Sequence, residues 1–292
     1  MLTVALAIAP RERKRATAGT GAKDRNEVSQ LQRIVLAADQ LPGPQVQLTA
    51  DQQHYLTRVL RLKAGDRFVA LDGQGQGWNA QMVGTAEALL LESVGRSREV
   101  PIPIMLVAAL PKGSGFDEVV RQATELGVSH IQPVLSQRTL LNPSPQKLDR
   151  WRKIAQEAAE QSERMQVPTI GAPVPFVEAI ASISASHRYL CAARGEAPSL
   201  LTQLVGDRPQ ATSLCVAVGP EGGWTEAEIE AAIAAGYQPV SLGARILRAV
   251  TAPLAAIALM AALWETSAFP ETPVAEGDAS DGTFPISSAS HP

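Results

Sequence analysis

The sequence predicts an α/β protein in which a small β-rich module precedes a larger domain built on a parallel sheet. Between about residues 31 and 97, short strand-like segments alternate with turns rich in Gly, Pro and Asp. After Pro101 and Pro103 the pattern changes to apolar strands that alternate with amphipathic helices, which is typical of a parallel sheet covered on both faces. The chain has 292 residues, of which 45% are hydrophobic, so two domains with their own cores are expected.

The β-rich module is expected to contain five strands and one helix. The strands are predicted at residues 33–37, 45–49, 66–72, 78–84 and 88–94. The helix is predicted at residues 51–66, with Asp51 as its N-cap and Gly65 as its stop. The stretch GQGQG at residues 73–77 indicates a hairpin, and a phosphate-binding loop is disfavoured because no helix follows it.

The second domain is expected to alternate strands and helices along its length. Its strands are predicted at residues 104–110, 130–136, 188–193, 213–219 and 238–243. Its helices are predicted at residues 115–128, 145–164, 199–205 and 225–237, followed by a last helix that begins at Pro253. Residues 1–30 and 267–292 lack a core pattern, so a flexible extension and a disordered tail are expected there.

The charges nearly cancel, but they are unevenly distributed. The chain has 26 basic and 29 acidic residues, and the net charge of −3 argues against blanket electrostatic binding to nucleic acid. Residues 1–170 carry 21 basic and 17 acidic side chains, whereas residues 171–292 carry 5 and 12. A polyanion is therefore expected to contact the N-terminal part of the chain.

The cysteines and the apolar stretches indicate a cytoplasmic protein. Cys191 and Cys215 both lie in apolar stretches, so buried thiols are expected rather than a disulfide or a metal site. No apolar stretch approaches the ~18 residues that suggest a membrane span. At the start of the chain the charges follow the apolar run, which is the wrong order for a signal peptide. We therefore expect an enzyme of the cytoplasm with no membrane and no metal partner.

Three loops are expected to meet at the carboxyl edge of the parallel sheet, where such sheets bind ligands. They are CAARGEA at residues 191–197, VGPEGGW at 218–224 and SLGARILRAVTAP at 241–253. None has the spacing of a dinucleotide or P-loop motif, but their glycines allow a ligand to approach the backbone closely. Glu226 and Glu228 in the first turn of the next helix disfavour an anion, so a neutral or cationic ligand is expected. A simple tight turn is the alternative.

Arg245 and Arg248 bracket two apolar residues at the start of the last, apolar helix. Arginines in such a setting either cover apolar surface with their stems or hold a carboxylate or phosphate through two hydrogen bonds. The sequence leaves both interpretations open.

Four segments, in this order, resemble those of the RsmE-type 16S rRNA (uracil-N3)-methyltransferases, which belong to the SPOUT class of knotted methyltransferases. They are HYLTRVLRLKAGD, LPKGSGFDEVVRQATELGV, RWRKIAQEAAEQSERMQVPTI, and the stretch over residues 216–259 that contains GPEGGW and LGARILR. The resemblance covers about residues 31–265, and the ordered set of four is far more specific than any one segment.

The resemblance implies a PUA-like β-barrel for RNA contact at residues 31–99, followed by a SPOUT methyltransferase domain with a trefoil knot at residues 100–266. It also implies a homodimer, S-adenosylmethionine as the cofactor, and methylation of uracil N3 at one uridine in 16S rRNA of the small ribosomal subunit. The chain departs from the family at two places. Ala249 and Val250 stand where the family carries Thr-Glu after its Arg-Ile-Leu-Arg motif, and the segment PKGSGFDEV is less basic than in family members that have an arginine near Ser114 and Gly115.

With this family in view, particular residues become candidates. Arg248 and Arg164 are expected to contact the uracil or a phosphate, and no general base is assigned. The cofactor candidates are Ala192, Val218, Gly219, Pro220, Glu221, Gly222, Gly223, Leu242, Gly243, Ile246, Leu247 and Arg248. The RNA-binding candidates are Arg33, Arg58, Arg61, Lys63, Lys112 and Arg138. Because Arg58 and Arg61 are three residues apart, they are expected to share one helix face.

Two other functions stay open at this point. One is a related SPOUT methyltransferase that acts on another RNA. The other is a non-catalytic RNA-binding or ribosome-assembly factor that has kept the fold without its chemistry.

Overall fold

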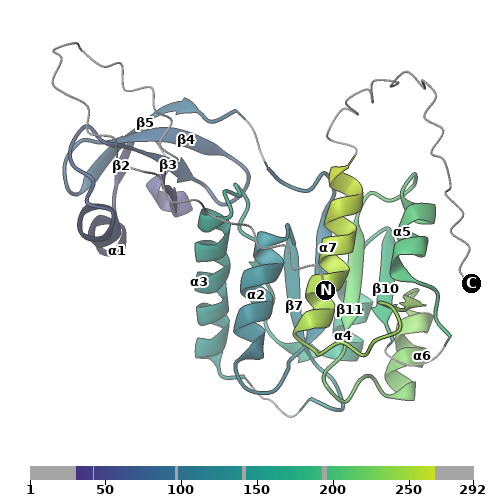
Figure 1. The fold of residues 1–292 in the computed structure, drawn as a ribbon. Helices are drawn as coiled ribbons and strands as arrows, with labels where there is room; N and C mark the ends of the chain where they lie inside the picture. The colour runs from purple at the N-terminus through teal and green to yellow at the C-terminus, as the bar shows by residue number, and fades with distance from the viewer. Residues whose placement is uncertain (1–30, 42, 96–97, 140–142, 193–195, 267–292) are drawn as a thin grey trace, which may run out of the picture. The chain divides into compact units, whose positions relative to one another are not determined.

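The computed structural model describes residues 31–41, 43–95, 98–139, 143–192 and 196–266 (Figure 1). The predicted N-terminal extension and C-terminal tail lie outside these residues. The described chain forms two β-sheets, one from the N-terminal strands and one from the strands that follow Pro103.

The N-terminal sheet has five strands in the described chain, as the sequence predicted. They are β1 (Arg33–Val35), β2 (Gln45–Gln47), β3 (Arg67–Leu71), β4 (Gly77–Met82) and β5 (Glu87–Ser93). Their order is β1-β3-β4-β5-β2, with β1 parallel to β3 and the other neighbours antiparallel. Alternate side chains of β3 and β4, including Phe68 and Met82, are buried in one apolar cluster, so this sheet has its own core.

The helix of this module begins earlier than the sequence predicted. α1 (Ala50–His54) is capped by Thr49, whose side-chain oxygen accepts a hydrogen bond from the Gln52 backbone N–H at 3.3 Å. The Gln52 side chain returns the contact by accepting from the Thr49 N–H at 2.9 Å, which completes a capping box. Asp51 lies inside the first turn, so its prediction as the N-cap was wrong.

The same helix also ends earlier than predicted. A π-helical turn over Tyr55–Val59 follows α1, and the chain then leaves the helical region, because Arg61 has a φ of 59°. Gly65 is therefore not the residue that stops the helix. Arg58 and Arg61 do not share a helix face, which corrects the prediction from their spacing.

All strand pairs of the second sheet in the described chain are parallel. The strands are β6 (Ile104–Ala109), β7 (His130–Leu135), β8 (Thr169–Ile170), β9 (Val174–Pro175), β10 (His187–Cys191), β11 (Leu214–Val218) and β12 (Gln238–Val240). Their order is β12-β10-β11-β6-β7-β8, and β9 pairs with β7. Because β10 lies between β11 and β12, the loops that follow these three strands start side by side at one edge of the sheet.

Helices cover both faces of this sheet (Figure 1). They are α2 (Gly115–Glu125), α3 (Pro145–Gln161), α4 (Phe176–Ser182), α5 (Leu200–Asp207), α6 (Glu226–Ala234) and α7 (Thr251–Glu265). Side chains of α2, α3, α5 and α7 pack in one apolar cluster, and those of α4 and α6 pack in a second. In β11, Val216 belongs to the first cluster and Ala217 to the second, so this strand is buried on both faces. Its sequence is therefore a continuous run of apolar residues.

Two parts of this domain differ from the prediction. The segment with β8, β9 and α4 was not predicted, because these elements are too short to give a clear periodicity. The last helix begins at Thr251 rather than Pro253, because the Arg248 carbonyl accepts hydrogen bonds from the N–H groups of Thr251 and Ala252, each at 2.9 Å. Pro253 is tolerated there because the N–H groups of a first helical turn have no intrahelical partner.

The α/β class with a parallel sheet and a separate β-module is confirmed. The trefoil knot stays a prediction from the resemblance. Within the described ranges, no helix combines the length and the apolar character needed to cross a membrane.

Candidate cofactor pocket

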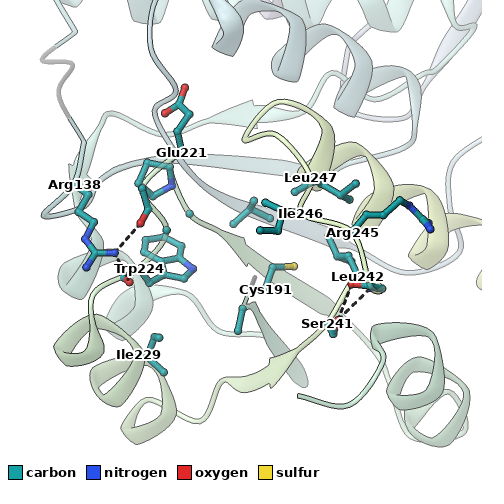
Figure 2. A pocket seen from close by; sticks show the side chains of 18 residues that line it. Arg138, Cys191, Glu221, Trp224, Ile229, Ser241, Leu242, Arg245, Ile246 and Leu247 are labelled. Carbon is teal, nitrogen blue, oxygen red and sulfur yellow. Dashed lines mark hydrogen bonds between the residues drawn. The ribbon is translucent and has the colours of Figure 1, made fainter. Parts of the chain in front are cut away.

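A cavity of about 260 Å³ opens at the carboxyl ends of β10, β11 and β12, where the three predicted loops meet (Figure 2). Its first wall is formed by residues 218–224, which follow β11, and its second wall is formed by residues from 241 to 247, which follow β12. Cys191 and Ala192, at the end of β10, lie between the two walls. The position is the one that parallel sheets use for ligands.

The first wall depends on glycine at two positions. A Cβ on Gly219 would lie 3.1 Å from Cε2 of Trp224, so any side chain there would press on the indole ring. Gly223 has a φ of 69°, and its N–H donates to the Pro220 carbonyl at 2.8 Å. The tight turn considered from the sequence is therefore present, and it exposes the loop backbone to the cavity.

Arg138, from the loop after β7, holds this wall in place. Its Nη1 donates hydrogen bonds to the carbonyl oxygens of Gly222 at 2.7 Å and Trp224 at 3.2 Å (Figure 2). A Cβ on Gly222 would lie 3.2 Å from Arg138 Cδ, so a glycine is needed beneath the arginine stem. The sequence suggested Arg138 for RNA binding, but the structure places it in the cavity wall with its guanidinium on two carbonyls.

Glu228 and Glu221 are engaged in local structure, whereas Glu226 is exposed. The Glu228 side chain is 3% exposed, and its carboxylate accepts from the backbone N–H groups of Thr225 and Gln137, each at 2.8 Å. Glu221 turns its carboxylate away from the cavity and accepts from the Lys112 N–H at 3.0 Å (Figure 2). Because Glu228 is committed to capping α6, the expected bias against anionic groups is weaker than the sequence indicated.

The second wall places cationic and apolar side chains next to one another. Gly243 has a φ of 110°, and its N–H donates to Ser241 Oγ at 3.1 Å, which shapes the start of this loop. Ile246 is 71% exposed, and Leu247 is partly exposed beside it. Arg245 is exposed and also lines the cavity. This wall therefore offers apolar surface for a flat ring and a cation at its rim.

Arg248 lies just beyond the lining of the cavity. Its side chain is exposed and forms no ion pair among the residues that the structure describes. Ala249 is buried, and a Cβ on Gly115 would lie 2.8 Å from Cγ1 of Val250. The pair that departs from the family pattern is thus an apolar contact between the start of α7 and the start of α2.

Most of the predicted cofactor residues line the cavity, and the exception is Arg248. Those in the lining are Ala192, Val218, Gly219, Pro220, Glu221, Gly222, Gly223, Leu242, Gly243, Ile246 and Leu247. Residues that the sequence had not assigned to the cofactor are Arg138, Cys191, Trp224, Ile229, Ser241, Arg245 and Ala252. Cys191 and Trp224 stand inside loops that the sequence singled out, so their positions in these loops were the available signal. Burial raises the pKa of the Cys191 thiol to about 12, which keeps the thiol neutral.

Arg164 has a structural role, which corrects its prediction as a substrate contact. Its side chain is 3% exposed, and its Nε and Nη2 donate to Glu99 Oε2 at 2.9 and 2.7 Å. Its Nη1 donates to the carbonyl oxygens of Thr124 and Val128, each at 2.8 Å. The Arg164 guanidinium therefore connects the end of α2, through the Thr124 carbonyl, to Glu99 in the segment before β6. It does not line the cavity.

The other basic candidates fall into two groups. Arg33 lies 3.1 Å from the buried carboxylate of Glu163, so its charge is engaged within the protein. The exposed candidates are Arg58, Arg61, Lys63 and Lys112. These four stay predictions for RNA contact.

His54 and His130 do not lie in the cavity lining. His130 Nδ1 is 2.7 Å from Thr169 Oγ1, and burial lowers the pKa of this imidazole. His54 is exposed at the end of α1. Within the described residues, no cluster of three or more His, Cys, Asp or Glu side chains suits a metal ion.

Family models and known relatives agree with this architecture. The model of an RNA methyltransferase domain matches residues 98–261, and that of an RNA methyltransferase PUA domain matches residues 48–90. Ribosomal RNA small subunit methyltransferase E of Synechocystis sp. is 49% identical over 238 residues, which are 80% of this chain and 78% of the relative. The chain belongs to the family of ribosomal RNA small subunit methyltransferase E. The family member from Bacillus subtilis is 30% identical over 228 residues, covering 74% of this chain and 89% of that protein.

A solved member of the family shares the fold. The crystal structure of ribosomal RNA small subunit methyltransferase E from Neisseria gonorrhoeae, bound to S-adenosyl methionine, has a TM-score of 0.72 and 33% sequence identity. The match covers 80% of this chain and 98% of that one. The resemblance to this family is therefore confirmed, whereas the boundaries predicted at residues 30, 99 and 266 stay predictions.

Proposed function

We propose that the chain uses S-adenosylmethionine to methylate N3 of one uridine in 16S rRNA of the small ribosomal subunit. The observation that carries the proposal is the cavity at the ends of β10, β11 and β12, built by the glycine loop and the arginine loop that also carry the family resemblance. A relative with the same fold has been solved with this cofactor bound.

The lining fits the chemistry of this cofactor. Leu242, Ile246 and Leu247 offer apolar surface that suits an adenine ring. The backbone at Gly223 is open to close approach, which suits the hydroxyl groups of a ribose. When bound, the cofactor supplies an electrophilic methyl group and takes back the electron pair of the methyl–sulfur bond as a neutral thioether.

The residues outside the lining suit the uracil. The base must be unstacked to reach the rim of the cavity, as in other enzymes that modify a base. Arg248 is exposed beside the lining, where its guanidinium can stabilise the negative charge that develops on O2 and O4 as N3 loses its proton. The proton passes to solvent, because among the described lining residues there is no histidine, and the one carboxylate, Glu221, is turned away.

We also propose that the enzyme is a homodimer of the cytoplasm, where ribosomal subunits are assembled. The support is a set of partly exposed residues on α7, Leu254, Ala255, Ala258 and Leu259, which repeat at helical spacing. The described part of α7 has no charged residue before Glu265. Light scattering on the full chain should give twice the mass of one chain at micromolar concentration, and the mass of one chain would contradict the dimer.

The activity is tested with small ribosomal subunits from a strain that lacks its own uracil-N3 methyltransferase. The purified chain and labelled S-adenosylmethionine are incubated with assembled 30S particles, naked 16S rRNA, 23S rRNA and tRNA in parallel. We expect N3-methyluridine in the nucleoside digest of small-subunit rRNA, at one position that primer extension maps. Label in 23S rRNA or tRNA alone would favour a related enzyme with another substrate. Cofactor binding without methyl transfer to any RNA would favour a non-catalytic factor.

A matched pair of variants tests the role of Arg248. Arg248→Ala should keep the affinity for S-adenosylmethionine within a few-fold and lose methyl transfer by about 100-fold, the usual scale for losing one preorganised stabiliser of developing charge. Arg152→Ala removes an exposed arginine of α3 and should leave both quantities unchanged. Equal transfer rates for the two variants would contradict the role given to Arg248.

A further inference from the structure

Trp224 carries a buried hydrogen-bond donor that has no acceptor among the described residues. The side chain is 7% exposed and lines the cavity. Its ring stacks on Phe176, with the ring centroids 4.1 Å apart and the planes inclined by 25°. The indole Nε1 itself is shielded from solvent, and no acceptor of the described chain reaches it. An indole nitrogen can only donate, so its hydrogen-bonding capacity is unused.

The contrast with Trp151 shows that this chain provides an acceptor where an indole belongs to the core. Trp151 is 1% exposed, and its Nε1 donates to the carboxylate of Asp117 at 3.0 Å. Buried tryptophans normally find such a partner, because an unsatisfied donor in a protein interior is costly. Trp224 differs in facing a cavity, which indicates that its acceptor arrives with a ligand.

The surroundings direct the nitrogen toward the ligand space. Figure 2 shows the indole nitrogen on the side of the ring that faces Cys191, away from Arg138. A Cβ on Gly219 would lie 3.3 Å from Nε1, so any larger residue there would stand in the space next to this atom. Because Nε1 is shielded from solvent, we expect the ring to tilt slightly when an acceptor binds.

We propose that the indole N–H of Trp224 donates a hydrogen bond to the carboxylate of the amino-acid part of bound S-adenosylmethionine. The inference rests on the proposed function and assigns the orientation of the cofactor in the cavity. A carboxylate is the strongest hydrogen-bond acceptor that this cofactor carries. The amino-acid part then lies along the first wall, and the adenine lies against the second.

The apolar surfaces of the two walls support this orientation, whereas each wall carries one arginine, Arg138 in the first and Arg245 in the second. Arg138 places a guanidinium in the first wall beside Trp224, and the carboxylate of Glu221 points away from the cavity. The second wall offers the apolar side chains of Leu242, Ile246 and Leu247. The apolar side chains therefore favour a flat, neutral ring on the second wall, and the unpartnered indole N–H of Trp224 favours a carboxylate on the first.

The test measures the affinity of the full chain for three compounds by calorimetry. S-adenosylmethionine and S-adenosylhomocysteine carry the carboxylate, whereas 5′-methylthioadenosine keeps the adenosine and lacks the amino-acid part. Trp224→Phe retains a ring that can stack on Phe176 and removes the N–H. We expect its Kd for the first two compounds to rise about 10-fold, as for a lost hydrogen bond to a charged group, and its Kd for the third to stay unchanged.

Trp78→Phe is the matched control. Trp78 lies in β4, is partly exposed and does not line the cavity. It should leave all three affinities unchanged. The wild-type chain also gives a direct readout, because the ¹⁵N-indole signal of Trp224 should shift downfield on addition of S-adenosylmethionine and much less with 5′-methylthioadenosine. The Trp151 signal should stay in place, and the wild-type spectra decide the matter even where Trp224→Phe folds poorly.

The outcomes separate this inference from the proposed function. A wild-type chain that binds none of the three compounds overturns the cofactor assignment, and the inference falls with it. A wild-type chain that binds S-adenosylmethionine with an unmoved Trp224 signal overturns the inference alone. Equal weakening of all three compounds by Trp224→Phe also overturns it, because the contact would then lie on the adenosine.

Discussion

Removal of the Arg138 guanidinium tests whether the loop after β7, which the sequence did not assign to the site, affects the affinity of the cavity for S-adenosylmethionine. Arg138 donates to the carbonyls of Gly222 and Trp224, so it holds the first wall in one conformation. Hydrogen bonds that involve a charged group contribute about 1.5–3 kcal/mol each when buried. Because the Arg138 side chain is exposed, we reduce the sum for both bonds to about 1–2 kcal/mol. Arg138→Ala should then raise the Kd for S-adenosylmethionine about 5–30-fold.

The assay is a calorimetric titration of the full chain with S-adenosylmethionine, with two companion variants. Arg138→Lys keeps the charge but lacks the planar fork, so we expect its Kd to lie closer to that of Arg138→Ala than to wild type. Lys112→Ala is the control, because Lys112 contacts this wall only through the hydrogen bond from its backbone N–H to Glu221. Its Kd should match wild type.

The result that would refute this reasoning is an unchanged cofactor affinity in Arg138→Ala. If the same variant bound small-subunit rRNA more weakly, and with a smaller dependence on salt, Arg138 would be a phosphate contact, as the sequence suggested. The two roles predict opposite outcomes in the two titrations, so one set of measurements decides between them.

The remaining predictions concern buried groups. Glu228→Gln should lower the free energy of unfolding by about 1–3 kcal/mol in urea titrations, because the carboxylate accepts from the Thr225 and Gln137 backbone N–H groups. Cys215 is buried and should resist iodoacetamide at pH 8 until the chain is denatured, because burial raises the pKa of its thiol to about 12. Glu160→Gln should raise the melting temperature more at pH 8 than at pH 5. Burial raises the pKa of Glu160, so its ionised form costs stability, and this cost is relieved as the pH falls. Equal shifts at both pH values would contradict this assignment.

The sequence predicts most of the fold because apolar periodicity is a local property. The strands of both sheets and the long helices repeat over enough residues for the period to be visible. The helix after Thr49 was misjudged because its apolar pattern continues past Val59, while the backbone turns at Arg61. A positive φ at an arginine leaves no trace in composition. The short α4 (Phe176–Ser182) is stabilised by its packing against the sheet. Its seven residues are too few to show a helical periodicity in the sequence.

The loops of the site were predictable, but the partners of individual side chains were not. Three glycines beside a strand allow a ligand to approach the backbone closely. Arg138 and Gly222 are 84 residues apart, and Arg164 and Glu99 are 65 apart. In each case the strand order of the folded sheet brings together groups that the sequence keeps separate. One arginine expected to bind RNA therefore holds the pocket, and one expected to bind substrate is buried.

The Ala249-Val250 pair shows how the site can depart from the family pattern without losing its architecture. The departure moves a polar group out of the edge of the site and replaces it with a methyl group packed close to Gly115. The arginine before this pair stays exposed, and its carbonyl still starts α7. Methylation at uracil N3 depends more on stabilising the anion that forms than on a general base held in one position, because the imide proton can pass to water. A cation in the place of Arg248 can meet that need without a neighbouring carboxylate, so we infer that the substitution alters packing at the start of α7 and leaves the methyl-transfer step to Arg248.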